Sequence, residues 1–315
     1  MNRKAIIFGI KTYKLTNREK FFLKKTKPWG IILFSRNVKN LIQLKKLTDE
    51  IRFTLKDDLY PILIDQEGGK VSRLNKIIDL SAFSQEYFSD LFNRNKKLFF
   101  IYYKIYIDTV SSILTESGIN INTVPVLDVK RIKSHKIIGS RSFSNNPTKV
   151  SSLGNYCINF YHKNKIATVV KHIPGHGLSK HDTHHKKSVI KKNKRYLQKV
   201  DFLPFKNCKT FFAMTAHLIF EKFDTINTVT HSKLLINEVI RKFINFKGIL
   251  ISDDISMKSL EYKLEENATR ALQAGCNIVL HCNGNISEML RLSKVIPRID
   301  KFTKKKTSQF YKFLM

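Results

Sequence analysis

Eight short apolar runs recur along the chain, and helix-length amphipathic segments separate most of them. Each run is rich in β-branched or aromatic residues and has the length of a buried strand. The runs span residues 5–9, 30–34, 61–64, 121–127, 167–170, 211–215, 248–251 and 277–281. Strands that alternate with helices form a parallel sheet, and eight of them fit a closed barrel better than an open doubly wound sheet. The sequence therefore predicts an α/β fold, a single (β/α)8 TIM-type barrel.

The segments between these runs indicate how the domain is organised. Amphipathic stretches of helix length occupy residues 41–55, 98–114, 150–161, 232–243 and 260–274. The segment 71–100 is longer than one connection requires, so we expect an insertion over the barrel mouth. We predict that residues 1–290 form the barrel. Residues 291–315, which include the basic run 301–306, are expected to form a helical tail packed on the barrel or trailing from it.

The charge balance of the chain is strongly basic. A formal net charge of +32 would ordinarily suggest a nucleic acid or an anionic membrane as a partner. The lysines, however, are spread over nearly every predicted helix and loop, and no helix-turn-helix, zinc-finger or aromatic RNA-binding motif accompanies them. We therefore expect no specific nucleic-acid partner. A non-catalytic basic protein that binds anionic polymers is the alternative from another functional class.

Cysteine usage and hydropathy predict the compartment. The four cysteines show no CxxC spacing, and a chain of 315 residues does not need disulfide staples. The apolar run 5–10 is too short for the core of a signal peptide, and no stretch of the sequence approaches the length of a membrane span. The sequence predicts a soluble cytoplasmic protein with no membrane partner.

Polar side chains follow most of the predicted strands at their carboxyl ends. They are Asp65, Asp128, Lys171 with His172, His217, Asp253 with Asp254, and Asn283. In barrel enzymes this end of the strands carries the active site. One strand-end Asp is explained equally well as a helix N-cap, but six strand ends that converge on one rim are not. The pattern predicts a polar pocket.

The densest group of such residues lies in the segment 171–185. The run Lys-His-Ile-Pro-Gly-His-Gly at 171–177 is followed by His181, Asp182, His184 and His185. A cation, a carboxylate and five imidazoles directly after a buried strand favour a catalytic loop over a simple connection. A zinc site built from these histidines is an alternative. Against it, the spacings form no HExxH-like motif, and the neighbouring lysine would repel a cation.

These residues belong to a set of motifs that occur in a fixed order over roughly residues 5–285. The motifs occupy residues 28–30, 33–37, 65–74, 125–129, 139–143, 171–177, 214–217, 252–257 and 274–277. With them the chain resembles the bacterial β-N-acetylhexosaminidases of glycoside hydrolase family 3, the NagZ type. The resemblance implies a retaining hydrolase that removes a terminal non-reducing N-acetylglucosamine through a covalent glycosyl-enzyme intermediate.

The resemblance also implies roles for individual residues. Asp253, in the Ser-Asp motif at the seventh strand, would be the nucleophile. His184 would act as acid and base, paired with Asp182, while His185 competes for that role by sequence alone. The residues implied to bind the hydroxyls and the acetamide of the sugar are Asp65, Arg73, Arg141, Lys171 and His172. This chemistry needs no cofactor and no metal.

The implied substrate is a cytoplasmic peptidoglycan fragment, N-acetylglucosamine linked β-1,4 to an anhydro-N-acetylmuramoyl peptide, and the implied role is cell-wall recycling by a monomeric enzyme. A β-N-acetylglucosaminide phosphorylase on the same scaffold is the closest alternative, because a neutral imidazole does not repel an incoming phosphate. We expect His176 and His217 to be structural residues, or to contact the site residues rather than the substrate. Asp254 is expected to turn away from the pocket or to orient its neighbour.

Overall fold

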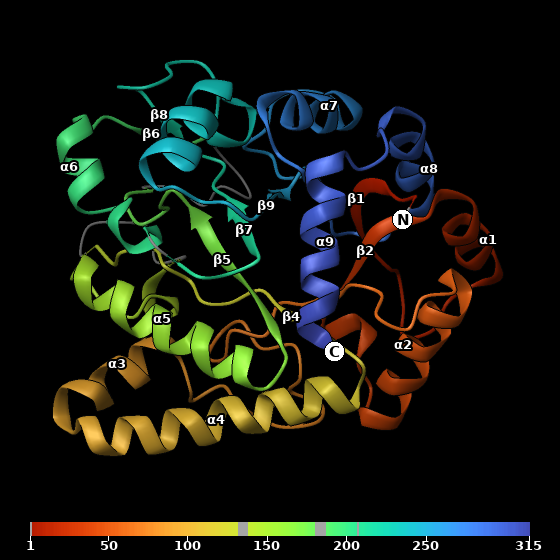
Figure 1. The fold of residues 1–315 in the computed structure, drawn as a ribbon, viewed down its shortest axis with the longest axis horizontal. Helices are drawn as coiled ribbons and strands as arrows, with labels where there is room; N and C mark the ends of the chain where they lie inside the picture. Colours follow the sequence, from red (N-terminus) through yellow and green to blue (C-terminus); the bar gives the residue numbers. More distant parts are fainter. Residues whose placement is uncertain (1, 132–137, 180–186, 207) are drawn as a thin grey trace.

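The eight predicted strands close into a parallel barrel in the computed structural model, which describes residues 2–131, 138–179, 187–206 and 208–315 (Figure 1). The barrel strands are β1 (Lys4–Gly9), β2 (Pro28–Leu33), β3 (Ile62–Ile64), β4 (Ile121–Asn122), β5 (Ala167–Ile173), β7 (Phe212–Thr215), β9 (Ile249–Asp254) and β10 (Ile278–His281). They pair in the order β1-β10-β9-β7-β5-β4-β3-β2, and β2 returns to β1. The predicted (β/α)8 TIM-type barrel is confirmed.

The closure of the barrel joins the first and last strands in register. Ile6 pairs with Val279 and Phe8 with His281, while β1 pairs with β2 along its other edge. Every residue of β2 and β5 is buried. Parallel strands that are covered on both faces read as continuous apolar runs, which is why the apolar runs of the sequence located the strands.

Helices surround the barrel, and each predicted helical segment has a counterpart among them (Figure 1). The α-helices of the described residues are α1 (Asn17–Thr26), α2 (Leu41–Leu55), α3 (Gln85–Arg94), α4 (Lys96–Glu116), α5 (Pro147–Lys163), α6 (Lys194–Lys199), α7 (Leu264–Ala274), α8 (Ile286–Val295) and α9 (Lys301–Leu314). The predicted helix over 232–243 is a π-helical segment, η5 (Leu235–Phe243). None of the described helices combines the length and the apolar character needed to cross a membrane.

One predicted strand is much shorter than its apolar run. The run 121–127 forms a regular strand only at Ile121–Asn122. Pro125 has no N–H to offer a neighbouring strand. Hydrogen bonding to β5 resumes at its carbonyl, which accepts the Lys171 N–H at 3.2 Å, and at the Leu127 N–H, which donates to the Lys171 carbonyl at 2.8 Å. The chain therefore leaves the regular ladder at the rim of the barrel.

The long connection between β3 and β4 contains the predicted insertion. Its first part makes a tight turn in which the Glu67 N–H donates to the Val71 carbonyl at 2.9 Å. Helices α3 and α4 follow and pack against each other outside the barrel (Figure 1). Val71 and Arg73 line the cavity at the barrel mouth, so this connection forms part of the mouth.

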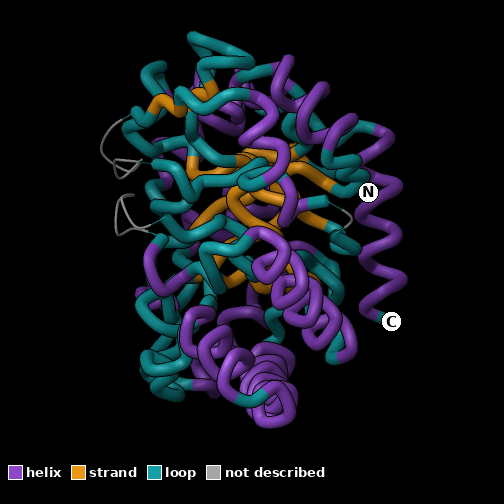
Figure 2. Tube along the Cα trace, turned by 90° about the vertical axis from the view of Figure 1, so that its left-hand side faces the viewer, coloured by secondary structure: helices purple, strands orange, loops and turns teal. Residues whose placement is uncertain are grey.

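Helix α9 lies against the amino-terminal ends of the strands. The Trp29 indole N–H at the start of β2 donates to the Thr307 hydroxyl at 2.9 Å, and the Phe310 ring lies edge-on to Phe212 of β7, with centroids 5.3 Å apart. Figure 2 shows this helix, which ends near the label C, running along one side of the strands. Residue 290, the predicted boundary between barrel and tail, lies within α8. The division into a barrel and a tail stays a prediction.

Removal of the Phe310 ring should destabilise the fold. Phe310 is fully buried against Phe211 and Phe212, so Phe310→Ala is expected to lower the free energy of unfolding by about 3–5 kcal/mol. The matched control is Phe302→Ala on the same helix, where the side chain is 39% exposed and the expected loss is about 0.5 kcal/mol. Urea unfolding followed by circular dichroism measures both. Equal losses would contradict a core role for α9.

Candidate functional site

A cavity of about 210 Å³ opens at the carboxyl-terminal ends of the strands. The polar side chains that line it are Asp65, Arg73, Arg141, Lys171, His172, His176, Asp253 and Asp254. Six of the predicted site residues are thus brought to one place from β5, β9 and the connections after β3 and β4. A polar cavity at this end of a barrel is the usual position of an active site.

Asp65 follows β3 and lies between two cations. Its Oδ2 accepts a hydrogen bond from Arg73 Nη2 at 2.9 Å, and its Oδ1 accepts one from Lys171 Nζ. The Thr123 hydroxyl also donates to Oδ1. Burial alone would raise the pKa of Asp65, but the charges of Lys171 and Arg73 outweigh burial and hold the pKa well below its usual range. Asp65 is therefore an ionised acceptor at neutral pH.

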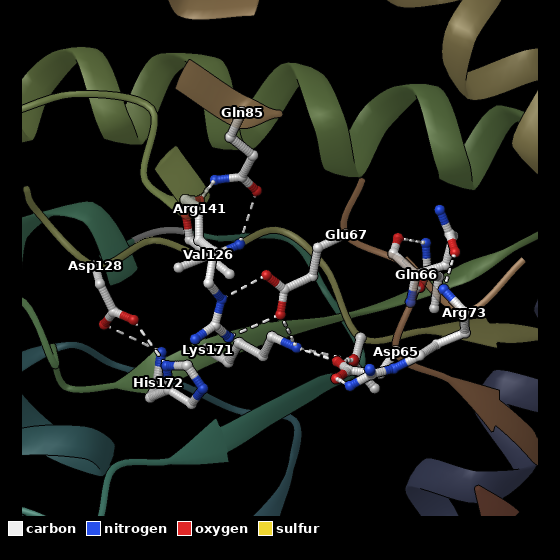
Figure 3. A network of polar contacts seen from close by, with 12 residues as sticks. Asp65, Gln66, Glu67, Arg73, Gln85, Val126, Asp128, Arg141, Lys171 and His172 are labelled. Carbon is white, nitrogen blue, oxygen red and sulfur yellow. Dashed lines mark hydrogen bonds and ion pairs between the residues drawn. The ribbon is translucent and has the colours of Figure 1, made fainter. Parts of the chain in front are cut away.

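A buried carboxylate that the sequence analysis did not single out supports the same cations. Arg141 donates to Glu67 through two bonds, from Nε to Oε2 at 2.7 Å and from Nη2 to Oε1 at 2.8 Å (Figure 3). Lys171 Nζ lies 2.6 Å from Oε1 of the same carboxylate. Burial alone would raise the pKa of Glu67, but Arg141 and Lys171 hold it below its usual value. The signals in the sequence were its place in the motif at residues 65–74 and its position two residues after Asp65.

Asp128 forms hydrogen bonds to the histidines at the end of β5 and just after it. Its Oδ2 lies 2.7 Å from His172 Nδ1. Its Oδ1 accepts hydrogen bonds from two backbone N–H groups, that of His172 at 3.2 Å and that of His176 at 2.6 Å. A carboxylate at Nδ1 keeps a proton on that nitrogen, so Nε2 of a neutral His172 is an acceptor. A Cβ at Gly177 would collide with the Val129 carbonyl, so glycine is needed where the segment after β5 packs on the rim.

Asp253 is the penultimate residue of β9 and is half-buried at the wall of the cavity. Its Oδ1 accepts the backbone N–H of Asp254 at 2.8 Å. Burial lowers the pKa of His176 to about 4, and the charges of Asp128 and Asp253 oppose that shift. A carboxylate at this position is able to form a bond to an electrophilic carbon in the cavity.

Asp254 is engaged with the turn that follows the strand. Its Oδ1 accepts the Ser256 N–H at 3.1 Å, and its Oδ2 accepts the Ser256 hydroxyl at 2.8 Å. Oδ1 also accepts the Cys282 N–H at 3.4 Å. The two neighbouring acids therefore differ, because the Asp254 carboxylate caps a turn whereas the charge of Asp253 acts on His176 and His217.

The predicted acid and base pair, His184 and Asp182, lies outside the described residues, as do His181 and His185. Within the described parts of the chain, no group of three or more His, Cys, Asp or Glu side chains could hold a metal ion. The acid/base assignment and the zinc alternative both stay predictions.

Three carboxylates in and behind the cavity wall should make the stability of the fold depend on pH. Because the pKa values of Asp65, Glu67 and Asp128 are lowered on folding, the unfolded chain binds more protons than the folded one in mildly acidic solution. Their contribution is complete above about pH 5 and is lost as the pH falls below about 4. Urea midpoints measured from neutral to acidic pH should therefore fall, and less steeply for Asp65→Asn. An Asp65→Asn variant with an unchanged slope would contradict this linkage.

The chain matches the family described as Glycosyl hydrolase family 3 N terminal domain over residues 5–308. It is 30% identical over 284 residues to a beta-hexosaminidase of Actinobacillus pleuropneumoniae serotype 3, a match that covers 88% of this chain and 81% of the relative. It is 29% identical over 290 residues to a beta-hexosaminidase of Neisseria meningitidis serogroup C, with 89% of this chain and 78% of the relative covered.

Solved structures resemble the whole chain. Two structures of NagZ from Neisseria gonorrhoeae each superpose with a TM-score of 0.87 at 27% identity, covering 98% of this chain and 90% of the other. One of them contains N-trifluoroacetyl-D-glucosamine, and the other contains a zinc ion.

Proposed function

Because this chain belongs to glycosyl hydrolase family 3, we propose that it removes a terminal non-reducing N-acetylglucosamine from its substrate with retention of the anomeric configuration. It is a glycoside hydrolase of the β-N-acetylhexosaminidase type. One observation carries the proposal: the Asp253 carboxylate lines the same cavity as Asp65, Arg141 and Lys171. A nucleophile and a set of polar groups suited to a sugar thus share one small space.

Two displacements at the anomeric carbon make up the proposed reaction. In the first, a carboxylate oxygen of Asp253 bonds to that carbon, the bond to the aglycone oxygen breaks, and His184 gives its proton to the leaving oxygen. In the second, neutral His184 takes a proton from water, and the water oxygen displaces the Asp253 carboxylate. Asp182 orients the imidazole and stabilises its protonated form.

The remaining cavity residues are proposed to bind the sugar. Asp65, held ionised by Lys171 and Arg73, accepts hydrogen bonds from hydroxyls. Arg141 donates to sugar oxygens, and His172, oriented by its bond to a buried carboxylate, contacts a hydroxyl or the acetamide. A site built to pair each polar group rejects analogues that lack the partner group.

The proposed substrate is a cytoplasmic N-acetylglucosaminyl-β-1,4-anhydro-N-acetylmuramoyl peptide, and the proposed role is peptidoglycan recycling by a monomer. The ligand in the gonococcal NagZ structure is an N-acylated glucosamine, and this supports a sugar of the same kind here. The relatives are beta-hexosaminidases, and this supports a β-linkage.

Hydrolysis of p-nitrophenyl N-acetyl-β-D-glucosaminide in phosphate-free buffer tests the proposal. The first-formed sugar, followed by proton NMR, should be the β-anomer, and the anhydromuramoyl disaccharide peptide should be cleaved as well. Failure to release nitrophenol, or release of the α-anomer first, would contradict the proposed reaction. Formation of the sugar 1-phosphate when phosphate is added would assign the chain to the phosphorylases instead.

A further inference from the structure

A chain of buried polar groups joins the end of β7 to the peptide that follows the proposed nucleophile. His217 Nε2 lies 3.0 Å from the Asp254 carbonyl oxygen, and His217 Nδ1 lies 2.7 Å from the Thr230 hydroxyl. The Thr230 hydroxyl in turn lies 2.8 Å from the Thr215 hydroxyl. The side chains of Thr215, His217 and Thr230 are at most 1% exposed. Buried groups of this kind are held in one arrangement by their partners.

The direction of each bond in this chain follows from the chemistry of its members. A carbonyl oxygen only accepts, so His217 Nε2 carries the hydrogen that points to Asp254. In a neutral imidazole Nδ1 is then an acceptor, and the Thr230 hydroxyl donates to it rather than to the Ala216 carbonyl, 3.4 Å away. Burial lowers the pKa of His217, so the ring is neutral at neutral pH. The Asp254 carbonyl requires this tautomer and the hydrogen bond from the Thr230 hydroxyl stabilises it, so the two partners set the tautomer together.

The Asp254 backbone is held at both of its polar groups. Its carbonyl accepts from His217 and from the Met257 N–H at 3.1 Å, and its N–H donates to the Asp253 carboxylate at 2.8 Å. The N–H lies in the peptide plane before the Asp254 Cα and the carbonyl in the plane after it, so a shift of the Asp254 backbone as a whole would move the N–H that donates to Asp253 Oδ1. The position of the proposed nucleophilic oxygen therefore depends on the anchor that His217 provides.

We infer that His217 is a positioning residue that holds Asp253 in its attacking orientation, through the Asp254 backbone and in the tautomer that Thr230 stabilises. This inference rests on the proposed function, in which Asp253 is the nucleophile. His217 acts on the rate of the chemical steps and not on sugar binding, because the contacts described above do not include the sugar-binding side chains.

Variants of the two residues test the inference. His217→Phe removes the donor, and Thr230→Val removes the hydroxyl that stabilises the tautomer. A displacement near 1 Å at a reacting group costs on the order of 100-fold in rate, so kcat should fall by about that factor in His217→Phe and by about tenfold in Thr230→Val. Thr230→Ser keeps the hydroxyl and should restore most of the wild-type kcat. The dissociation constant of N-acetylglucosamine should stay within about twofold throughout, because the sugar-binding groups are unchanged.

A half-buried histidine next to this chain provides the matched control. His231 bonds the Asn267 carbonyl at 3.1 Å and does not contact Asp254, so His231→Gln should keep the wild-type kcat even if it lowers the melting temperature. Wild-type kcat in His217→Phe, or no difference between Thr230→Ser and Thr230→Val, would overturn the inference while the proposed function stands. A wild type that releases no sugar, or an Asp253→Ala variant that keeps full activity, would overturn both.

Discussion

Asp253→Ala is expected to lower kcat/KM for p-nitrophenyl N-acetyl-β-D-glucosaminide by about 10⁴-fold or more, because the covalent intermediate cannot form without the carboxylate. N-Acetylglucosamine should still bind, since Asp65, Arg73 and Lys171 remain in the cavity. Initial rates in phosphate-free buffer give the first quantity, and calorimetric titration gives the second.

Two further measurements sharpen this result. Azide added to Asp253→Ala should occupy the space that the carboxylate leaves and yield the α-glycosyl azide, the configuration opposite to that of the normal product. The matched control is Asp254→Asn, whose carboxylate is engaged with Ser256 and whose kcat/KM should fall by less than about tenfold. Equal losses in the two variants would show that neither acid is the specific nucleophile.

The second large effect is expected at Glu67, a buried carboxylate that pairs both with the buried Lys171 and with the partly buried Arg141. Glu67→Gln leaves Arg141 and Lys171 without the carboxylate that they share, and removal of one partner from a buried ion pair costs about 3–5 kcal/mol. KM should rise as well, because both cations are proposed to bind the sugar. Urea unfolding and steady-state kinetics measure the two effects.

A matched control and a double variant separate charge from packing at this site. Glu86 pairs with Lys130 at the half-exposed surface, and Glu86→Gln should change the free energy of unfolding by less than about 1 kcal/mol. Glu67→Gln combined with Arg141→Met removes one of the two cations that pair with Glu67, so it should recover part of the lost stability while activity stays low. A single variant as stable as the wild type would contradict the role of Glu67.

The sequence located the strands because a buried parallel strand needs one continuous apolar run, and little else in a chain of this kind requires one. The prediction was wrong in detail for 121–127, where most of the apolar run is not strand. Burial of side chains continues beyond Asn122, but the regular pairing of the backbone does not, and Pro125 lies in that stretch. An apolar run in the sequence indicates directly which side chains are buried, but it indicates only indirectly which backbone groups form the hydrogen bonds of a strand.

The site was predictable where it depends on topology. The carboxyl ends of parallel strands meet at one rim, so Asp65, Lys171 and Asp253 had to lie near one another once the barrel was predicted. The role of Glu67 depends on Arg141, which is 74 residues further along the chain and at no strand end. No local pattern encodes such a pairing, so family resemblance found Arg141, and only the structure found its partner.

The pairing that closes the barrel also sets a delay during synthesis. Ile6 of β1 pairs with Val279 of β10, roughly 270 residues later, and a ribosome that adds about 5–20 residues per second needs about 15 to 50 s to supply the second strand. Throughout this time β1 exposes one unpaired edge, which invites pairing with other chains. Lys4 begins that strand, and Arg3 and Lys11 lie just before and after it; charges in such positions oppose aggregation. Part of the chain's high positive charge therefore protects it before the barrel has closed.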